Sequence, residues 1–151
     1  MIAIDPGKNG GIAWLDHDKI LHTQKMPDTV GSIADLLRQI RTVAVHEVFL
    51  EKVGGFVAGT PAPGSAMFSF GENYGALQGC LACLGYRYQL VSPQTWQKPL
   101  GMGTRASSGG ATEWKRKLKA EAQRRFPTID VTLWNADALL ILDYGINLRS
   151  P

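Results

Sequence analysis

The sequence contains few cysteines, few histidines and no long apolar run, and each shortage argues against a class of protein. Its two cysteines, Cys80 and Cys83, have no second pair to join, which argues against a disulfide framework and favours a reducing cytoplasm. The three histidines are scattered and form no set typical of a zinc site. We expect no signal peptide, and no apolar run approaches the roughly 20 residues that cross a membrane.

What remains is the composition of an ordinary globular protein. The 151 residues predict one domain, residues 1–151, with a single substantial core. A hydrophobic content of 44% excludes intrinsic disorder. The formal net charge of +3 and the pI of about 9.0 are only a weak indication of nucleic-acid binding, so the distribution of the charge matters more than its total.

The N-terminus shows the pattern of a strand, a tight turn and a second strand. Met1–Ile4 is a short apolar run of the kind that is buried on both faces of a sheet. Asp5 ends this run and is followed by a glycine-rich turn and a second apolar run, residues 12–15. A carboxylate at the tip of a buried strand needs hydrogen bonds or a cation. The alternative, that Asp5 only initiates a turn, explains this stretch equally well.

The next segments predict a third strand, a helix and a fourth strand. The third strand completes an antiparallel meander, and Ser32 caps a helix with apolar residues at the helical period. Residues 45–51 form the fourth strand, which ends on Glu51. Because a strand–helix–strand passage usually makes a parallel crossover, Asp5 and Glu51 are expected at the same carboxyl edge of the sheet.

A loop rich in glycine and proline, residues 54–64, directly follows Glu51 and is a candidate for recognition. The long helix after it, residues 65–84, has a glycine at every fourth position: Gly71, Gly75 and Gly79. Such a face allows close packing, and packing against the protein's own sheet is the preferred interpretation, with a dimer contact as the alternative. Cys80 and Cys83 on this helix are interpreted as small core residues.

The second half of the chain predicts a fifth strand and three helices. The strand covers residues 86–91, and Ser92 begins a short helix with proline at its first position. Residues 112–126 form a helix with an apolar stripe and basic residues on its other faces. Between Arg105 and Arg125 there are seven basic and two acidic residues, a larger excess than that of the whole chain. A solvated helix face explains this excess simply, and a surface that follows phosphates is the alternative.

The last predicted helix, residues 135–145, is so apolar that it must be buried against the sheet. Asp137 lies in its first turns. An acid there gains from the helix dipole, but a third carboxylate that converges with Asp5 and Glu51 is the preferred interpretation. Oxygen ligands from separate elements suit Mg²⁺, which binds a few carboxylates together with water and phosphate oxygens. Two such ions about 4 Å apart support phosphodiester cleavage.

Five short motifs follow one another along nearly the whole chain: Ile4–Gly7, Leu50–Val53, Ser65–Gly71, Ser92–Trp96 and Ala136–Leu140. Each is weakly specific alone, but the five in this order resemble the RuvC-type Holliday-junction resolvases and their bacteriophage relatives. The resemblance implies an α/β, ribonuclease H-like fold, a five-stranded mixed sheet with three antiparallel N-terminal strands and two parallel strands, flanked by helices. It also implies a cytoplasmic homodimer that cleaves symmetrically related strands of four-way DNA junctions and leaves 5′-phosphates.

By position, the resemblance makes Asp5, Glu51 and Asp137 the catalytic metal ligands, for two Mg²⁺ ions per site with Mn²⁺ as a substitute. Together with the charge distribution, it predicts a set of basic and aromatic contacts to branched DNA: Lys52, Phe56, Phe68, Lys98, Arg105, Lys115 and Arg116. In this set Phe56, in the loop after Glu51, is the candidate for stacking on a base.

The chain departs from the family pattern at three places. The family usually has a fourth acidic or histidine ligand one helical turn before the last acid, where this chain has Leu133 and Trp134. Asp130 reaches the site only if the last helix begins late. The segment before Asp137 is short, and Gln97 stands where a lysine is common.

These departures keep alternatives open. One is a junction-binding protein with weakened catalysis. Another is a nuclease of the same fold that acts on flaps, replication forks or RNA–DNA hybrids. An actin-like or sugar-kinase ATPase is disfavoured, because those folds need two related halves and a second phosphate loop, for which 151 residues leave no room.

Overall fold

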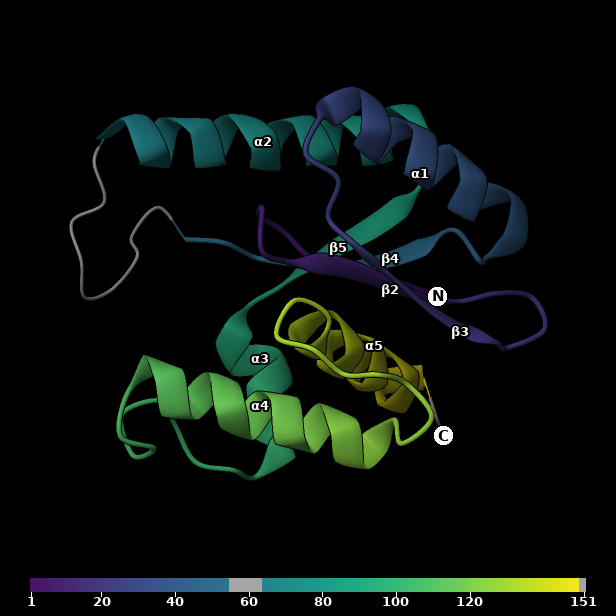
Figure 1. The fold of residues 1–151 in the computed structure, drawn as a ribbon. Coiled ribbons are helices and arrows are strands. Elements are labelled where there is room, and N and C mark those ends of the chain that lie inside the picture. The colour runs from purple at the N-terminus through teal and green to yellow at the C-terminus, as the bar shows by residue number, and fades with distance from the viewer. Residues whose placement is uncertain (55–63, 150–151) are drawn as a thin grey trace.

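The computed structural model describes residues 1–54 and 64–149, and over these ranges the chain forms a five-stranded sheet with helices on both faces (Figure 1). The elements, in chain order, are β1 (Ile2–Asp5), β2 (Gly11–Leu15), β3 (Leu21–Lys25), α1 (Val30–Val43), β4 (Glu47–Glu51), α2 (Gly64–Cys83), β5 (Arg87–Val91), α3 (Pro93–Gln97), the 3₁₀ helix η1 (Lys98–Leu100), α4 (Ala111–Arg125) and α5 (Ala136–Arg149). No helix in the described ranges is long and apolar enough to cross a membrane.

The sheet is mixed, with strand order β3-β2-β1-β4-β5. β1 pairs antiparallel with β2, and β2 pairs antiparallel with β3. β4 runs parallel to β1 and to β5, with Ile4 opposite Leu50 in the β1–β4 register. The predicted arrangement of three antiparallel and two parallel strands is confirmed.

Strand alternation divides the buried side chains between the two faces of the sheet. Ile4 and Leu50 belong to the core beneath α1 and α2. Ala3 and Phe49, one position earlier on each strand, belong to the core on the other face, which α3, α4 and α5 cover. Figure 1 shows these two helical layers on opposite sides of the sheet.

Helix α1 begins earlier than the sequence predicted. Its N-cap is Thr29, whose side-chain oxygen accepts a hydrogen bond from the Ser32 backbone N–H at 3.1 Å. Ser32 therefore lies within the first turn, and its prediction as the cap was wrong. Both residues have a hydroxyl that can cap a helix, and the apolar period that begins at Ile33 favoured the later one.

Helix α2 corrects two further predictions. A β-carbon added at Gly71, Gly75 or Gly79 would find no atom within 4 Å, so the glycine face is open and does not pack against the protein's own sheet. Cys83 is exposed, so its prediction as a core residue was wrong, whereas Cys80 is half-buried and packs against the core beneath α1 and α2. The contacts of α2 with the sheet side of the molecule come from Leu77 and Leu81 instead.

Helices α4 and α5 cover the other face, and the predicted apolar stripe of the first and burial of the second are confirmed. The α4 stripe buries Trp114, Leu118 and Ala122. The first seven residues of helix α5 are all buried, and its Gly145 approaches the sheet so closely that an added β-carbon would lie 2.7 Å from the Phe49 ring. Helix α5 therefore packs directly on the sheet, in contact with β1, β2 and β4.

Candidate active site

Three acidic residues meet at the carboxyl edge of β1 and β4. Asp5 follows Ala3 by two positions and Glu51 follows Phe49 by two, so strand alternation directs both carboxylates to the face covered by α4 and α5. Asp137 lies in the first turn of α5, which packs on β1. The sheet topology and one helix therefore bring the predicted acids together.

The proximity of these acids is visible in their electrostatics. Asp5 and Asp137 are 9% and 4% exposed. Burial raises the pKa of Asp5 well above its usual range, and repulsion by Asp137 and Glu51 raises it further. Burial, followed by repulsion from Asp137, also raises the pKa of Glu51. Buried like charges of this kind need a cation or a proton to be stable.

A lysine from α4 supplies positive charge inside this acidic cluster. The Lys115 ammonium forms a hydrogen-bonded ion pair with Asp137 Oδ2. Burial lowers the pKa of Lys115, but the hydrogen bond to Asp137 and the attraction by Asp137, Asp5 and Glu51 together outweigh it, so the net pKa is raised. Lys115 was predicted as a DNA contact on a basic helix face, and the structure places it against the acids.

Two aromatic residues hold Glu51. The indole N–H of Trp96 donates a hydrogen bond to Glu51 Oε1 at 3.1 Å, and Trp96 itself is fully buried. The Tyr74 hydroxyl donates to the Glu51 backbone carbonyl at 3.2 Å. Neither contact was predicted from the sequence, although Trp96 ends one of the family-like motifs.

The donor chemistry of the cluster suits a hard cation, although its present geometry does not form a closed cage. Asp137 Oδ1 is buried without a hydrogen-bond partner, as expected of an oxygen that another cation satisfies. Within residues 1–54 and 64–149, however, no group of three or more His, Cys, Asp and Glu side chains is already arranged to hold a metal. Lys115 occupies Oδ2 of Asp137, so Oδ1 is the oxygen of this carboxylate that remains without a partner.

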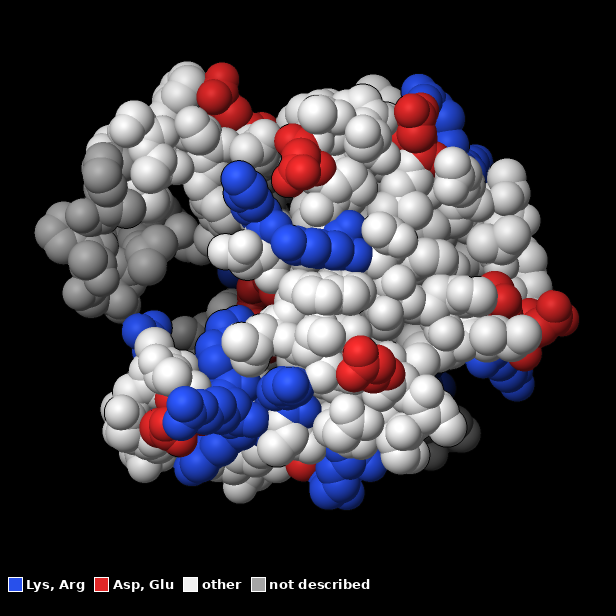
Figure 2. Space-filling view, in the orientation of Figure 1, with Lys and Arg blue, Asp and Glu red and all other residues white. Residues whose placement is uncertain are grey.

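The acids line a cavity of about 810 Å³ that also receives basic side chains. Glu51 and Asp137 lie in its wall, together with three residues that were predicted to contact DNA: Lys98, Arg105 and Lys115. Figure 2 shows Lys and Arg side chains gathered over α4, with acidic atoms visible in the hollow above them. An anionic polymer could thus approach the carboxylates along a basic surface.

Three other predicted DNA contacts lie outside this cavity. Lys52 is exposed just after β4, Phe68 is 68% exposed on α2, and Arg116 pairs with Glu113 on the surface of α4. The structure therefore groups Lys98, Arg105 and Lys115 and leaves these three as separate surface positions. The fourth, Phe56, lies outside the described residues.

The turn in which a fourth ligand was expected holds no acid that faces the cluster. Trp134 packs against the β2 strand, since a β-carbon at Gly11 would lie 2.8 Å from its ring. Leu133 is exposed. Asp130 is also exposed, and Asn135 donates a hydrogen bond to its backbone carbonyl at 3.1 Å. Helix α5 begins at Ala136, so the late start that Asp130 would need does not occur.

No protein-family model matches the sequence, and no curated protein is similar to it by sequence. Solved structures are similar in fold. The Thermus thermophilus RuvC in complex with a Holliday junction substrate has a TM-score of 0.61 at 14% identity, over 99% of this chain and 97% of that chain. A second Thermus thermophilus RuvC structure has a TM-score of 0.59 at 16% identity, over 98% and 96%. The fold is ribonuclease H-like.

At these identities the comparison shows a shared fold over almost the whole chain, and the chemistry must be argued from the residues of the site. Trp96 and Tyr74 are the site residues that sequence reasoning missed, and for Lys115 it missed the ion pair with Asp137. Lys115 directly follows the buried Trp114, but Lys119 follows the buried Leu118 in the same way, so adjacency alone does not single out Lys115 among the basic residues of α4.

Proposed function

We propose that this chain is a metal-dependent, structure-selective DNA endonuclease of the RuvC type, which resolves four-way junctions by paired symmetric cleavage. The observation that carries the proposal is the meeting of Asp5, Glu51 and Asp137 at one sheet edge, where Glu51 and Asp137 line a cavity that also receives basic residues. Residues 1–151 act as one nuclease domain in the cytoplasm. Membership of the bacteriophage branch remains a prediction.

The three acids are the proposed Mg²⁺ ligands, with Mn²⁺ as a substitute. Bound ions of this kind activate a water and stabilise the leaving oxygen of a phosphodiester. The chain's own residues prepare the site: Trp96 fixes the orientation of the Glu51 carboxylate, and the buried Asp137 Oδ1 is left available. Lys115 neutralises the acids before DNA arrives and can then donate to a phosphate oxygen.

The basic residues around the cavity hold the DNA backbone. Lys98 and Arg105 line the same cavity as Glu51 and Asp137, and both side chains are exposed. Contacts of this type neutralise phosphates and fix the register of the strand without reading its sequence. Selectivity for a junction then comes from the shape of the branched DNA.

A homodimer would match two cleavage sites to the symmetry of a four-way junction. The open face of α2 is the proposed contact, because Phe68, Gly71, Gly75 and Gly79 follow one another at spacings of three and four and so share one face. An exposed aromatic residue beside small residues allows two helices to approach closely. Phe68 was also predicted to contact DNA, so its replacement distinguishes the two roles.

The second candidate function is junction binding with weakened catalysis. It is favoured by the lack, among the described residues, of a ready-made metal cluster and by the lysine that occupies Asp137. The retained acids favour the nuclease, since three buried carboxylates have no purely structural benefit.

The deciding experiment offers end-labelled synthetic four-way junctions to the wild type and to Asp5→Asn, with Mg²⁺ or with a chelator. The proposal expects paired incisions at symmetric positions, dependent on Mg²⁺, and a loss of at least about 100-fold in Asp5→Asn, above the effect of a metal's outer-shell residues. Flaps, forks, linear duplex and RNA–DNA hybrids serve as competing substrates.

Three results would decide against the proposal. Tight junction binding without incision would support the binding protein. Faster cleavage of a flap, fork or hybrid would support a different nuclease of this fold. Equal cleavage by the wild type and Asp5→Asn would eliminate the carboxylate site.

A further inference from the structure

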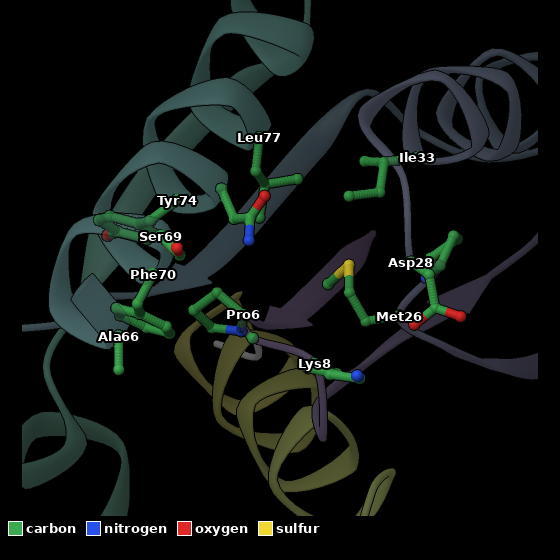
Figure 3. A pocket seen from close by; sticks show the side chains of 13 residues that line it. Pro6, Lys8, Met26, Asp28, Ile33, Ala66, Ser69, Phe70, Tyr74 and Leu77 are labelled. Atoms are coloured by element: carbon green, nitrogen blue, oxygen red, sulfur yellow. The ribbon is translucent and has the colours of Figure 1, made fainter. Parts of the chain in front are cut away.

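A second cavity, of about 470 Å³, lies on the opposite face of the sheet from the carboxylates. Figure 3 shows its side chains around a common space, contributed by α2, by α1, by the turn after β1 and by the segment after β3. Its volume falls within the range of roughly 300–1,000 Å³ that is typical of small-molecule sites.

The walls of this cavity combine an apolar interior with a polar margin. Pro6, Met26, Ile33 and Leu77 are buried and form the apolar part. Phe70 and Tyr74 are half-buried, and their rings are nearly parallel, with an interplanar angle of 6° and centroids 6.4 Å apart. Flat, amphipathic ligands bind well to a wall of this kind.

Four polar residues that line the cavity are exposed and have no internal partners. Within the part of the chain that the structure describes, the side chains of Lys8, Asp28, Ser69 and Asn73 make no hydrogen bond or ion pair with another residue. An ammonium, a carboxylate, a hydroxyl and an amide therefore remain available to a ligand that has both donors and acceptors.

The cavity adjoins the candidate active site through three residues. Pro6 and Gly7 directly follow Asp5, and Tyr74, which lines the cavity, donates a hydrogen bond to the Glu51 backbone carbonyl. The cavity therefore lies at the same sheet edge as Asp5 and Glu51, within reach of a DNA strand whose phosphate is bound there.

We propose that this cavity receives one unstacked nucleobase from the strand that is cleaved, next to the scissile phosphate. The inference rests on the proposed function and extends it, because it adds a base contact to a site otherwise built for phosphates. Phe70 and Tyr74 provide the faces on which the base packs, Asn73 and Ser69 contact its hydrogen-bonding edge, and Lys8 contacts the adjoining phosphate. The preferred base is set by Asn73.

A nucleobase explains these walls better than a side chain from a second copy of the protein. An apolar side chain would leave the exposed amide, hydroxyl and ammonium groups without partners, whereas a nucleotide has a π face, a polar edge and an anionic linkage. The proximity to Asp5 also places the cavity where DNA, rather than the open face of α2, is expected.

The test measures binding of a four-way junction in which single bases next to the cleaved linkage are removed to leave abasic sites. Ala66→Trp fills the cavity from an exposed position on α2. Ala120→Trp, an exposed position on α4 that lines neither cavity, is the matched control. Both proteins also carry Asp5→Asn so that binding is measured without cleavage.

The inference expects one abasic position to weaken binding of the Asp5→Asn parent and the control by about 10-fold, the contribution of one stacked base. Ala66→Trp should bind the intact junction about 10-fold more weakly and be insensitive to the abasic position. In otherwise wild-type protein, Asn73→Ala should reduce the preference among bases at that position by about 10-fold, with unchanged thermal unfolding.

Three outcomes would overturn the inference. The first is an abasic effect of equal size in Ala66→Trp and the control. The second is a change of sedimentation mass in Ala66→Trp without DNA, which would identify a second copy of the chain as the occupant. The third is a wild type that does not prefer the junction over linear duplex, and that result alone would also reject the proposed function.

Discussion

Helices α2 and α5 lie on opposite faces of the sheet and both contain glycine, but they use it in opposite ways (Figure 1). At Gly145 of α5, an added β-carbon would lie 2.7 Å from the Phe49 ring and 3.0 Å from the Met1 sulfur. At Gly75 of α2, nothing lies within 4 Å. One glycine lets a helix press on the sheet, and the other belongs to a face that the described chain leaves uncovered.

The contrast shows why a glycine period does not by itself identify a packing partner. Helix α5 is buried on all sides over residues 136–142, so a small residue there allows the helix to lie closer to the sheet or to α4. Helix α2 buries only Leu77 and Leu81, and its small residues fall on the other side. The position of Asp137 in the site follows from the close packing of α5 on the sheet.

The largest effect is expected where α5 meets the carboxylates. Asp137→Asn should reduce Mg²⁺-dependent junction cleavage by at least about 100-fold, because it removes a proposed ligand, and should leave the folded state intact. Asp143→Asn, on the same helix but paired with Arg125 outside the cavity, is the matched control and should cleave normally. Equal losses in both variants would attribute the effect to α5 packing and not to the carboxylate.

The second prediction is that replacing each of the two glycines by alanine changes the free energy of unfolding in opposite directions. Gly145→Ala should lower the free energy of unfolding by about 1–3 kcal/mol, the usual range for overpacking a core. Gly75→Ala should raise it by roughly 0.5–1 kcal/mol, because alanine favours an open helix position. Urea denaturation of both variants measures the pair, and changes of the same sign would contradict the contrast between the helices.

The parts of this contrast that the sequence could predict are the local ones. A parallel crossover is set by short patterns, so the common edge of Asp5 and Glu51 followed from them. The burial of α5 followed from its unbroken apolar composition. The start of α1 was missed by three residues because Thr29 and Ser32 offer the same capping group.

The parts that could not be predicted depend on how helices are rotated about their axes. Helix α2 has too little contrast between its faces for periodicity to show which side is buried, so the glycines were directed to the wrong side. Among the basic residues of α4, only packing of Trp114 decides that Lys115 turns toward Asp137. Trp134 likewise packs on Gly11, a contact between residues far apart in sequence.

The third prediction tests what covers α2. Gly75→Trp should weaken self-association by roughly 10-fold or more, equivalent to about 1.4 kcal/mol, because a bulky side chain separates two helices that meet through small residues. Sedimentation velocity measures the change, and unchanged circular dichroism shows that the fold is retained. Ala120→Trp on α4 is the control. An unchanged mass in Gly75→Trp would remove the α2 face as the dimer contact.

The smallest predicted effect is on the pH dependence of stability, and it is expected only on the face of the sheet that α4 and α5 cover. Hydrogen bonds from Arg124 and then Arg125 lower the pKa of Glu121 from its usual 4.5 to about 2, and Arg125 also pairs with Asp143 of α5. Because the folded pKa is the lower one, this contribution to stability is complete above pH 4.5 and is lost as the pH falls toward 2. Glu121→Gln should therefore be slightly less stable at pH 7 and less sensitive to acid in that interval, as measured by thermal unfolding.

The contact between α1 and the end of α2 behaves differently. There Arg41 donates a hydrogen bond to the backbone carbonyl of Leu84, and a carbonyl does not titrate. Arg41→Gln should lower stability by the same amount from pH 7 down to about pH 2, well below the pKa of the neighbouring Tyr86, and a parallel pH dependence in the two variants would contradict the difference between the faces.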